Sequence, residues 1–213
     1  MKIPSEELLL YAITDDRWTA NKTLIEQIED TLEGGATLVQ LRDKNLSEWT
    51  LLMEASKVLA LCHRFGVKLI INDNVEVARK SGADGIHLGK DDMPVTEARE
   101  ILGKTYIIGK SVKTVEEAIQ AQADGADYLG VGACFATETK NDAEKIDIDV
   151  LNEITRAVEI PVVAIGGITK NNMNELAGRG ISGVALVSAI FASKDIVRDT
   201  IELKAQAQKL FGN

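Results

Sequence analysis

The stretch Lys80-Ser81-Gly82-Ala83-Asp84-Gly85-Ile86-His87-Leu88-Gly89 decides the fold. A glycine turn precedes a short apolar run, which is the pattern expected where a helix stops and a buried strand begins. Related phrases precede other apolar runs, namely Glu-Gly-Gly-Ala-Thr (33–37), Ala-Asp-Gly-Ala-Asp-Tyr (123–128) and Gly-Arg-Gly-Ile-Ser-Gly (178–183). Their recurrence indicates a repeated unit in which a helix turns back into a strand.

Eight apolar runs of strand length alternate with amphipathic segments along the chain. The runs cover residues 8–13, 37–41, 68–71, 84–88, 106–109, 127–132, 162–165 and 183–187. Between them, apolar residues recur three and four apart, as in Leu24, Ile28 and Leu32, which predicts helices. The expected helix boundaries are the N-caps Ser47 and Thr114 and the stop residues Gly34, Gly66, Gly103 and Gly180.

Eight strand–helix units in a chain of 213 residues predict an α/β fold of one (β/α)8 TIM barrel, with a single domain over residues 1–213. An open, doubly wound sheet is the alternative. The barrel is preferred because the units are evenly spaced and no linker or low-complexity segment divides the chain.

The overall charge limits the classes of partner. A net charge of −9 argues against nucleic acid and anionic membranes, so the expected partners are small molecules. Cys62 and Cys134 lie far apart, the first residues lack a signal-peptide pattern, and no apolar run approaches membrane-spanning length. A reduced, cytoplasmic protein is therefore expected, and whether it forms a homo-oligomer stays open.

In a parallel barrel, reactive groups gather where the strands end, and side chains alternate between inside and outside. Gln40, Arg42 and Lys44 occupy alternate positions after Val39, so we expect Gln40 and Arg42 to face the barrel mouth. An unpaired buried arginine is energetically costly, so its position implies an anionic partner. That partner is either a ligand or a neighbouring carboxylate.

The third and fourth strand ends are rich in carboxylates. Asn72 is expected to point inward, with Asp73 at the rim, while Asn74 reads as a helix cap. Asp91 and Asp92 follow the fourth run and read as solvated acids or caps. With Asp73 they could instead hold Mg²⁺, which binds one or two carboxylates together with water and phosphate oxygens.

Two further side chains are candidates for the barrel interior. His87 lies between two glycines on the inward face, where it either shapes a site or is a satisfied core residue. Ser111 follows the fifth run and is expected to cap the next helix, or else to donate to a ligand.

The remaining strand ends suggest phosphate binding. Thr137-Glu138-Thr139-Lys140 follows a strand-like run and combines hydroxyls with an ammonium group, although a solvated loop has the same composition. Gly166-Gly167 and Val187-Ser188 end the last two runs, and in barrels this pair of loops often binds phosphate through backbone N–H groups.

Taken together, these motifs resemble the thiamin phosphate synthase family. The similarity runs from Tyr11-Ala-Ile-Thr-Asp15 to Val187-Ser-Ala-Ile190. Between them it includes Gln40-Leu-Arg-Asp-Lys44, Asn72-Asp73, Gly85-Ile-His-Leu-Gly89, Asp91-Asp-Met-Pro94, Gly109-Lys-Ser111, Thr137-Glu-Thr-Lys140 and Ile165-Gly-Gly-Ile168.

The resemblance implies an enzyme, a transferase of thiamine biosynthesis, that couples an aminopyrimidine methyl diphosphate to a thiazole phosphate and releases diphosphate. It implies Mg²⁺ as cofactor, bound by Asp73 and Asp92, and catalytic roles for Arg42, Ser111 and Lys140. It assigns the diphosphate to Arg42, Lys44, Asn72 and Lys140, and the pyrimidine to Gln40, Ser111 and His87. The thiazole phosphate is assigned to Thr137, Thr139, Gly167, Val187 and Ser188.

Five positions depart from the family pattern: Ala133, Ala136, Asn74, Lys90 and Lys113. The last of these separates the two enzymatic readings, because related thiazole tautomerases depend on a histidine two residues after the serine, where this chain has Lys113. A barrel that binds phosphate ligands without turnover is the non-enzymatic alternative.

Overall fold

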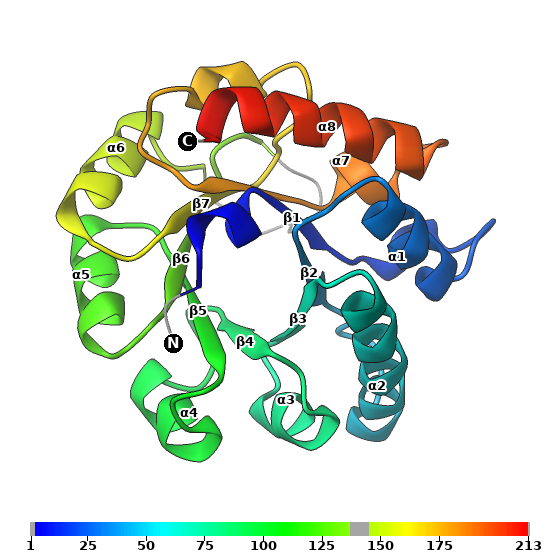
Figure 1. Cartoon of the computed structure of the whole chain (residues 1–213). Helices are drawn as coiled ribbons and strands as arrows, with labels where there is room; N and C mark the ends of the chain where they lie inside the picture. Colours follow the sequence, from blue (N-terminus) through cyan, green and yellow to red (C-terminus); the bar gives the residue numbers. More distant parts are fainter. Residues whose placement is uncertain (1–2, 137–144, 213) are drawn as a thin grey trace.

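The computed structural model describes residues 3–136 and 145–212. Its centre is a closed barrel in which eight parallel strands follow one another in chain order and β8 pairs with β1 (Figure 1). The strands are β1 (Leu10–Ile13), β2 (Leu38–Leu41), β3 (Lys68–Asn72), β4 (Gly85–Leu88), β5 (Ile107–Val112), β6 (Tyr128–Val131), β7 (Val162–Ile165) and β8 (Gly183–Leu186). The predicted (β/α)8 barrel is therefore confirmed.

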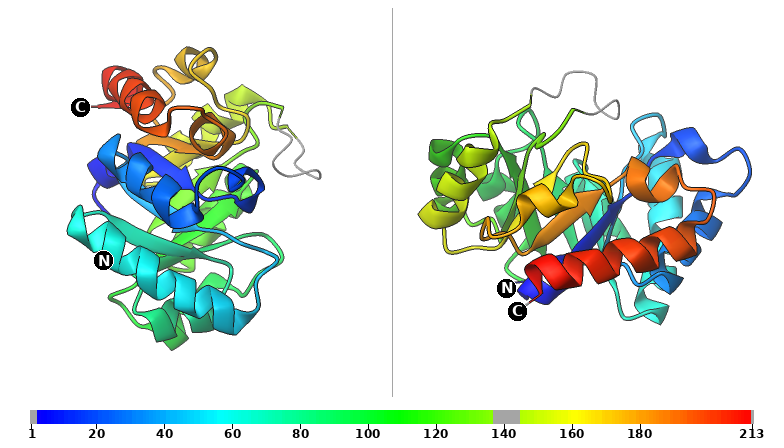
Figure 2. Two further views of the ribbon diagram at one scale, coloured as in Figure 1. Left: turned by 90° about the vertical axis from the view of Figure 1, so that its right-hand side faces the viewer. Right: turned by 90° about the horizontal axis from the view of Figure 1, so that it is seen from above.

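Helices surround this barrel, as the side and top views show (Figure 2). The α-helices are α1 (Leu24–Glu33), α2 (Glu48–Arg64), α3 (Val75–Ser81), α4 (Val95–Leu102), α5 (Val115–Ala123), α6 (Ile148–Ala157), α7 (Ser188–Phe191) and α8 (Ile196–Phe211). The 3₁₀ helices are η1 (Ser5–Leu8), η2 (Asp16–Trp18) and η3 (Met173–Leu176). None of the described helices is long and apolar enough to cross a lipid bilayer.

The predicted caps have mixed outcomes. Ser47 and Thr114 are the N-caps of α2 and α5, and each accepts a backbone N–H from the first turn. Gly34 and Gly103 are the C-cap residues of α1 and α4. Gly180 was wrongly expected to stop a helix: residues 166–182, all described, form only the 3₁₀ helix η3 between β7 and β8.

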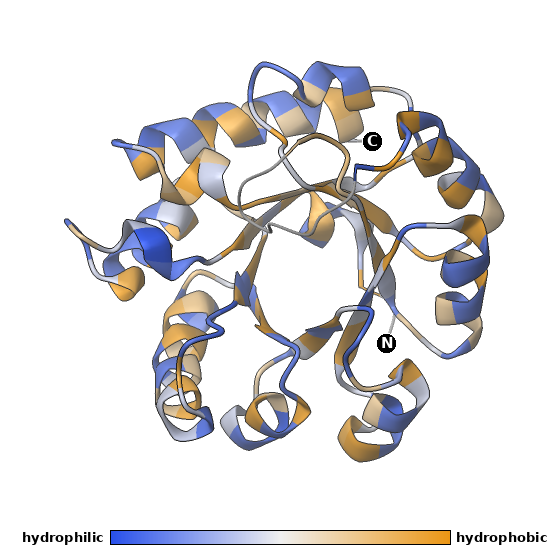
Figure 3. Cartoon of the chain, turned by 180° about the vertical axis from the view of Figure 1, so that it is seen from behind, coloured by the Kyte–Doolittle hydropathy of each residue, from blue (hydrophilic) through white to orange (hydrophobic). Residues whose placement is uncertain are grey.

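Strand side chains point alternately outward and inward, and they form one apolar layer outside the barrel and one inside it. Val39 and Leu41 belong to the large cluster between strands and helices, which agrees with the predicted inward position of Gln40 between them. A smaller cluster holds inward residues of the strands, closed at one end by Ile3 and Leu8. Figure 1 shows η1 lying across that end of the barrel. In Figure 3 the strands are largely hydrophobic and the helices are striped, as expected when one helix face packs on the barrel.

The repeated phrases have a common structural role. The residue just before each of β2, β4 and β6 makes two hydrogen bonds to one residue of the preceding strand. Its side-chain oxygen accepts that residue's backbone N–H at 2.8–2.9 Å, and its own backbone N–H donates to that residue's carbonyl at 2.7–3.0 Å. The pairs are Thr37 with Leu10, Asp84 with Leu69 and Asp127 with Ile108. Before β8, Ser182 keeps the backbone bond to Val162 at 2.8 Å. The sequence repeat thus fixes strand register at the start of every second strand.

Candidate active site

A cavity of about 390 Å³ opens where the strands end. Its lining comes from the ends of β1 to β5 and of β7 and β8, and from the loops that follow β4 and β6. The sequence-predicted residues that it brings together are Gln40, Arg42, Lys44, Asn72, Asp73, His87, Asp91, Asp92, Ser111, Gly167, Val187 and Ser188. These twelve residues are spread over most of the sequence, so only the closed barrel unites them.

Arg42 supplies a cation that protein carboxylates neutralise only loosely. Its guanidinium lies 3.9 Å from the Asp15 carboxylate, at the outer limit for an ion pair. Asp15 is held more tightly by Arg17, at 2.8 and 3.0 Å. The Arg42 backbone is fixed by Thr14, whose hydroxyl accepts the Arg42 N–H at 2.8 Å. The guanidinium is therefore placed at the cavity and retains capacity for an anionic ligand.

Two carboxylates meet on the β3–β4 side. Asp73 and Asp92 are close enough to share a hydrogen bond, and the Lys44 ammonium lies 3.6 Å from Asp73. Burial, together with the neighbouring Asp92 charge, raises the pKa of Asp73 to about 6. Burial also opposes ionisation of Asp92, but hydrogen bonds from Asp73 and from the Gly89 N–H outweigh it and lower the Asp92 pKa.

The local backbone aims these carboxylates. Asp73 adopts φ +63°, a left-handed conformation that Asp and Asn tolerate better than most residues. Asp92 accepts the Gly89 N–H at 2.6 Å, and the Lys110 ammonium donates to the Gly89 carbonyl at 2.5 Å. Asn74 caps α3 through a bond to the Val77 N–H at 2.9 Å, as expected. Asp91 is exposed, whereas Asp92 is half-buried against Asp73.

A buried line of hydrogen bonds runs beneath the cavity. Gln40 Nε2 donates to the Tyr11 hydroxyl at 2.6 Å, and the Tyr11 and Tyr128 hydroxyls are 2.9 Å apart. His87 Nδ1 lies 3.0 Å from the Tyr128 hydroxyl, and His87 Nε2 lies 2.8 Å from Ser111 Oγ. Burial raises the pKa of both tyrosines, so both phenols carry their protons.

Glycines of neighbouring strands make room for these rings. A Cβ at Gly109 would lie 2.1 Å from the Tyr128 ring, and a Cβ at Gly130 would lie 3.1 Å from His87. The space for the His87 ring thus comes from Gly130 on β6, whereas Gly85 and Gly89 beside it in the chain face other residues.

The β7 and β8 ends close the other side. A Cβ at Gly166 would lie 2.6 Å from Ala133, and one at Gly167 would lie 2.2 Å from the Ala136 carbonyl. Glycine is required at both positions because the β6 loop passes so close. Val187 and Ser188 begin the short helix α7 at the same edge. Thr137, Thr139 and Lys140 lie outside the described residues.

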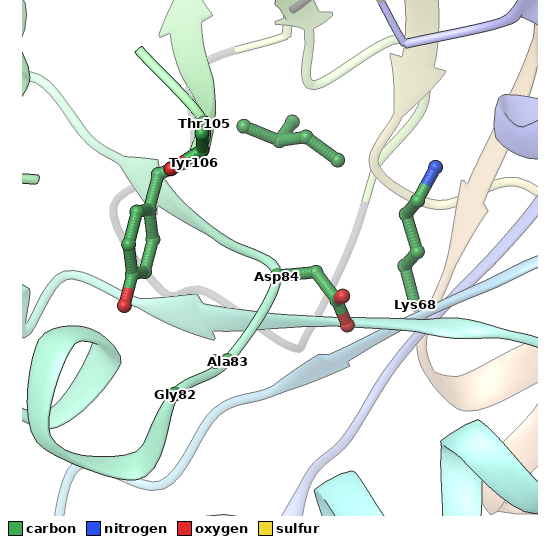
Figure 4. Close-up of a pocket in the computed structure, with 7 residues that line it drawn as sticks. Lys68, Gly82, Ala83, Asp84, Thr105 and Tyr106 are labelled. Carbon is green, nitrogen blue, oxygen red and sulfur yellow. The ribbon is translucent and has the colours of Figure 1, made fainter. Parts of the chain in front are cut away.

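A second hollow, of about 210 Å³, lies at the opposite end of the barrel (Figure 4). Its charged residues are engaged in the fold: Lys68 pairs with Glu7 at 2.5 Å, and Asp84 accepts the Leu69 N–H at 2.8 Å. It lacks the convergence of cations and carboxylates found at the strand ends.

Comparisons with known proteins agree with this geometry. Residues 10–190 match the family model described as thiamine monophosphate synthase. The chain belongs to the thiamine monophosphate synthase family.

Relatives in this family match nearly end to end. The chain is 46% identical to a thiamine-phosphate synthase of Ruminiclostridium cellulolyticum, over 94% of this chain and 92% of that protein. It is 43% identical to the thiamine-phosphate synthase of Pyrococcus horikoshii, over 97% and 98%. A solved thiamine phosphate pyrophosphorylase from Pyrococcus furiosus superposes with a TM-score of 0.90 at 38% identity, covering 98% of this chain and 99% of that one. Membership of this family makes the chain an enzyme, a transferase of thiamine biosynthesis.

The positions of Ser111 and of two tyrosines in this site differ from what the sequence predicts. Ser111 was expected by default to cap a helix, but β5 extends to Val112 and Thr114 takes the cap, so Ser111 points to His87. Tyr11 and Tyr128 were missed as part of the site. Strand alternation could have indicated Tyr11, because residues two apart on a strand face the same side and Tyr11 lies two residues before the inward Ile13. Tyr128 faces the same interior cluster.

Proposed function

We propose that the chain couples an aminopyrimidine methyl diphosphate to a thiazole phosphate and releases diphosphate, forming thiamine phosphate. The observation that carries the proposal is that one cavity unites the loosely paired Arg42, the carboxylates Asp73 and Asp92, and the polar side chains of Gln40 and Ser111. These are the groups that the two halves of such a substrate pair require.

Arg42, Lys44 and Asn72 are proposed to hold the diphosphate, together with Lys140 beyond the described residues. The methylene C–O bond breaks and its electron pair leaves with the diphosphate, so negative charge grows on the leaving group. A positioned guanidinium stabilises that charge more in the transition state than in the ground state. Because Arg42 is half-buried, its effect is screened less than that of a surface arginine.

Gln40, His87 and Ser111 are proposed to orient the aminopyrimidine, whose ring stabilises the methylene cation. The thiazole nitrogen then forms the new C–N bond. Gly167, Val187 and Ser188, with Thr137 and Thr139, are proposed to hold the thiazole phosphate at the β7 and β8 ends. Such a reaction needs no protein nucleophile, so the protein contributes mainly by positioning and by stabilising charge.

Asp73 and Asp92 are proposed to bind Mg²⁺. Among the residues that the structure describes, no three His, Cys, Asp or Glu side chains gather as a metal cluster. Two carboxylates nevertheless suit Mg²⁺, which takes its other ligands from water and phosphate. The raised pKa of Asp73 fits this role, because burial and the neighbouring Asp92 both disfavour its charge and a bound cation would offset that penalty. When bound, Mg²⁺ supplies charge neutralisation for the departing diphosphate.

The first test is release of diphosphate by the purified chain with both substrates and Mg²⁺. Arg42→Ala is expected to lower kcat/KM by about 10²-fold or more, as for loss of one transition-state donor. The matched control is Arg64→Ala on α2, whose exposed side chain pairs with Glu29 at 3.2 Å, and we expect it to retain full activity. Circular dichroism checks that both variants fold.

Two results would contradict the proposal. Conversion of a thiazole phosphate without diphosphate release would make the chain a tautomerase. Binding of both phosphorylated ligands without any product would make it a barrel that binds without turnover.

A further inference from the structure

The hydrogen-bonded line Gln40–Tyr11–Tyr128–His87–Ser111 crosses the barrel interior. Two tyrosines that are not in the cavity lining connect Gln40 to His87 and Ser111, which are, like Gln40, cavity residues. Tyr11 and Tyr128 are 1% and 0% exposed and lie within the small interior apolar cluster. Their hydroxyls therefore depend on one another, and on the ends of the line, for hydrogen-bond partners.

Gln40, at one end of the line, determines which atom donates and which accepts in each hydrogen bond. The Gln40 amide nitrogen can only donate, so the Tyr11 oxygen accepts and the Tyr11 proton must go elsewhere. Among the contacts of the described residues, Tyr128 is its acceptor. The Tyr128 proton then goes to His87 Nδ1. This is the arrangement that gives both buried phenol protons a partner.

The direction continues to the cavity. If Nδ1 accepts from Tyr128, a neutral His87 carries its proton on Nε2 and donates it to Ser111 Oγ. The Ser111 proton is then free to point into the cavity. At the other end, one N–H of the Gln40 amide is donated to Tyr11, which turns the amide nitrogen toward the barrel interior. The carbonyl oxygen on the other side of the amide is then the acceptor that Gln40 offers to a ligand in the cavity.

We propose that Tyr11 and Tyr128 are positioning residues. Because each accepts a hydrogen bond on the Gln40 side and donates one on the His87 side, they hold His87 as the Nε2–H tautomer. His87 then makes Ser111 a fixed hydrogen-bond donor to the substrate ring. The two ends of the line then present an acceptor, Gln40 Oε1, and a donor, Ser111 Oγ, to the cavity. This pair complements a ring that carries an exocyclic amine near an acceptor nitrogen, and it disfavours an oxo ring with the opposite pattern.

The direct test is ¹⁵N NMR of the imidazoles at a fixed neutral pH. The chain has two histidines, and His63→Gln, which removes the exposed imidazole beside Asp84, assigns the His87 signals. In the wild type we expect an unprotonated Nδ1 and a protonated Nε2. In Tyr128→Phe the Nδ1 signal should move as it loses its donor, and in Tyr11→Phe it should move less.

The third tyrosine provides a matched control. Tyr106 lies by the hollow at the other end of the barrel (Figure 4), so Tyr106→Phe should leave the His87 signals in place. A protonated Nδ1 in the wild type would overturn the inference without any variant. An unchanged His87 spectrum in Tyr128→Phe would overturn it too, and an unchanged spectrum in Tyr11→Phe would overturn the relay from Gln40.

Kinetics test the consequence for substrate. This arm rests on the proposed function, whereas the NMR arm does not, so absence of turnover in the wild type would count against the function alone. Tyr128→Phe should raise KM for the pyrimidine diphosphate about tenfold, the effect of one misdirected hydrogen bond, with kcat nearly unchanged. KM for the thiazole phosphate should not change. An equal rise in both KM values would indicate a general structural defect and overturn the positioning role.

Discussion

At the scale of single residues, the site depends on side chains whose role is set by their neighbours. Strand alternation was enough to place Gln40, Asn72 and His87 at the mouth, because the inward and outward positions of a strand are fixed by geometry. It could not give the role of Ser111, because the choice between a helix cap and an interior contact depends on where β5 ends. Hydrogen bonds between strands distant in sequence, such as Tyr11 to Tyr128, leave no local pattern.

Asp73 allows backbone conformation and charge to be separated. Asn tolerates its φ of +63° as well as Asp does, whereas Ala pays about 1 kcal/mol or more in that region. Asp73→Asn is therefore expected to fold with unreduced stability and to lose at least tenfold in Mg²⁺ affinity. Asp73→Ala should lose both affinity and stability. Calorimetric titration with Mg²⁺ and urea unfolding measure the two effects.

The exposed neighbour Asp91 is the control for this pair of variants. Asp91→Asn should leave the Mg²⁺ affinity within about twofold, because Asp92 is the carboxylate that meets Asp73. A larger loss in Asp91→Asn than in Asp73→Asn would reassign the metal site.

At the scale of elements, the eight strands could be predicted because each is a short apolar run after a turn signal. Their ends differ from the prediction by up to three residues, since register is fixed by contacts such as Asp127 with Ile108 that the apolar pattern does not contain. The connection between β7 and β8 could not be predicted as 3₁₀. Its Met173 and Leu176 are as buried as residues of a packed helix, so the apolar pattern is the same.

Arg99 on α4 ties two of these units together. Its guanidinium donates to the carbonyls of Gly103, Tyr106 and Gly125 and to the Asp127 carboxylate, at 2.6–3.0 Å. Arg99→Met should lower the free energy of unfolding by about 3 kcal/mol, because it removes the ion pair with Asp127 and three hydrogen bonds to backbone carbonyls. The midpoint of urea unfolding measures this loss.

Arg198→Met on α8 is the comparison for Arg99→Met. The Arg198 side chain is 73% exposed and pairs with Glu202 one turn away, so its loss should cost less than about 1 kcal/mol. Equal costs for the two variants would show that the Arg99 contacts do not hold the units together.

At the scale of the whole molecule, closure of the barrel brings Arg42 and Lys44 to one mouth, which gathers two cations at one site in a chain of net charge −9. The same closure forces Asp73 and Asp92 together, and burial raises the pKa of Asp73 to about 6, above the usual range for an aspartate. The folded protein therefore gains stability from Asp73 protonation at low pH and loses that contribution as pH rises through about 6.

Magnesium should stabilise the folded protein at pH values above about 6, where Asp73 is no longer protonated. Above pH 6, Asp73 is ionised in the folded chain, so we expect Mg²⁺ to bind the pair and raise Tm. Below pH 6, a proton competes for the same carboxylate, and the rise should shrink. Melting curves with and without Mg²⁺ at pH 7.5 and pH 5 measure the difference. Asp73→Asn should remove both the Mg²⁺ effect and its pH dependence. An equal rise in Tm at both pH values, retained in Asp73→Asn, would place Mg²⁺ elsewhere on the molecule.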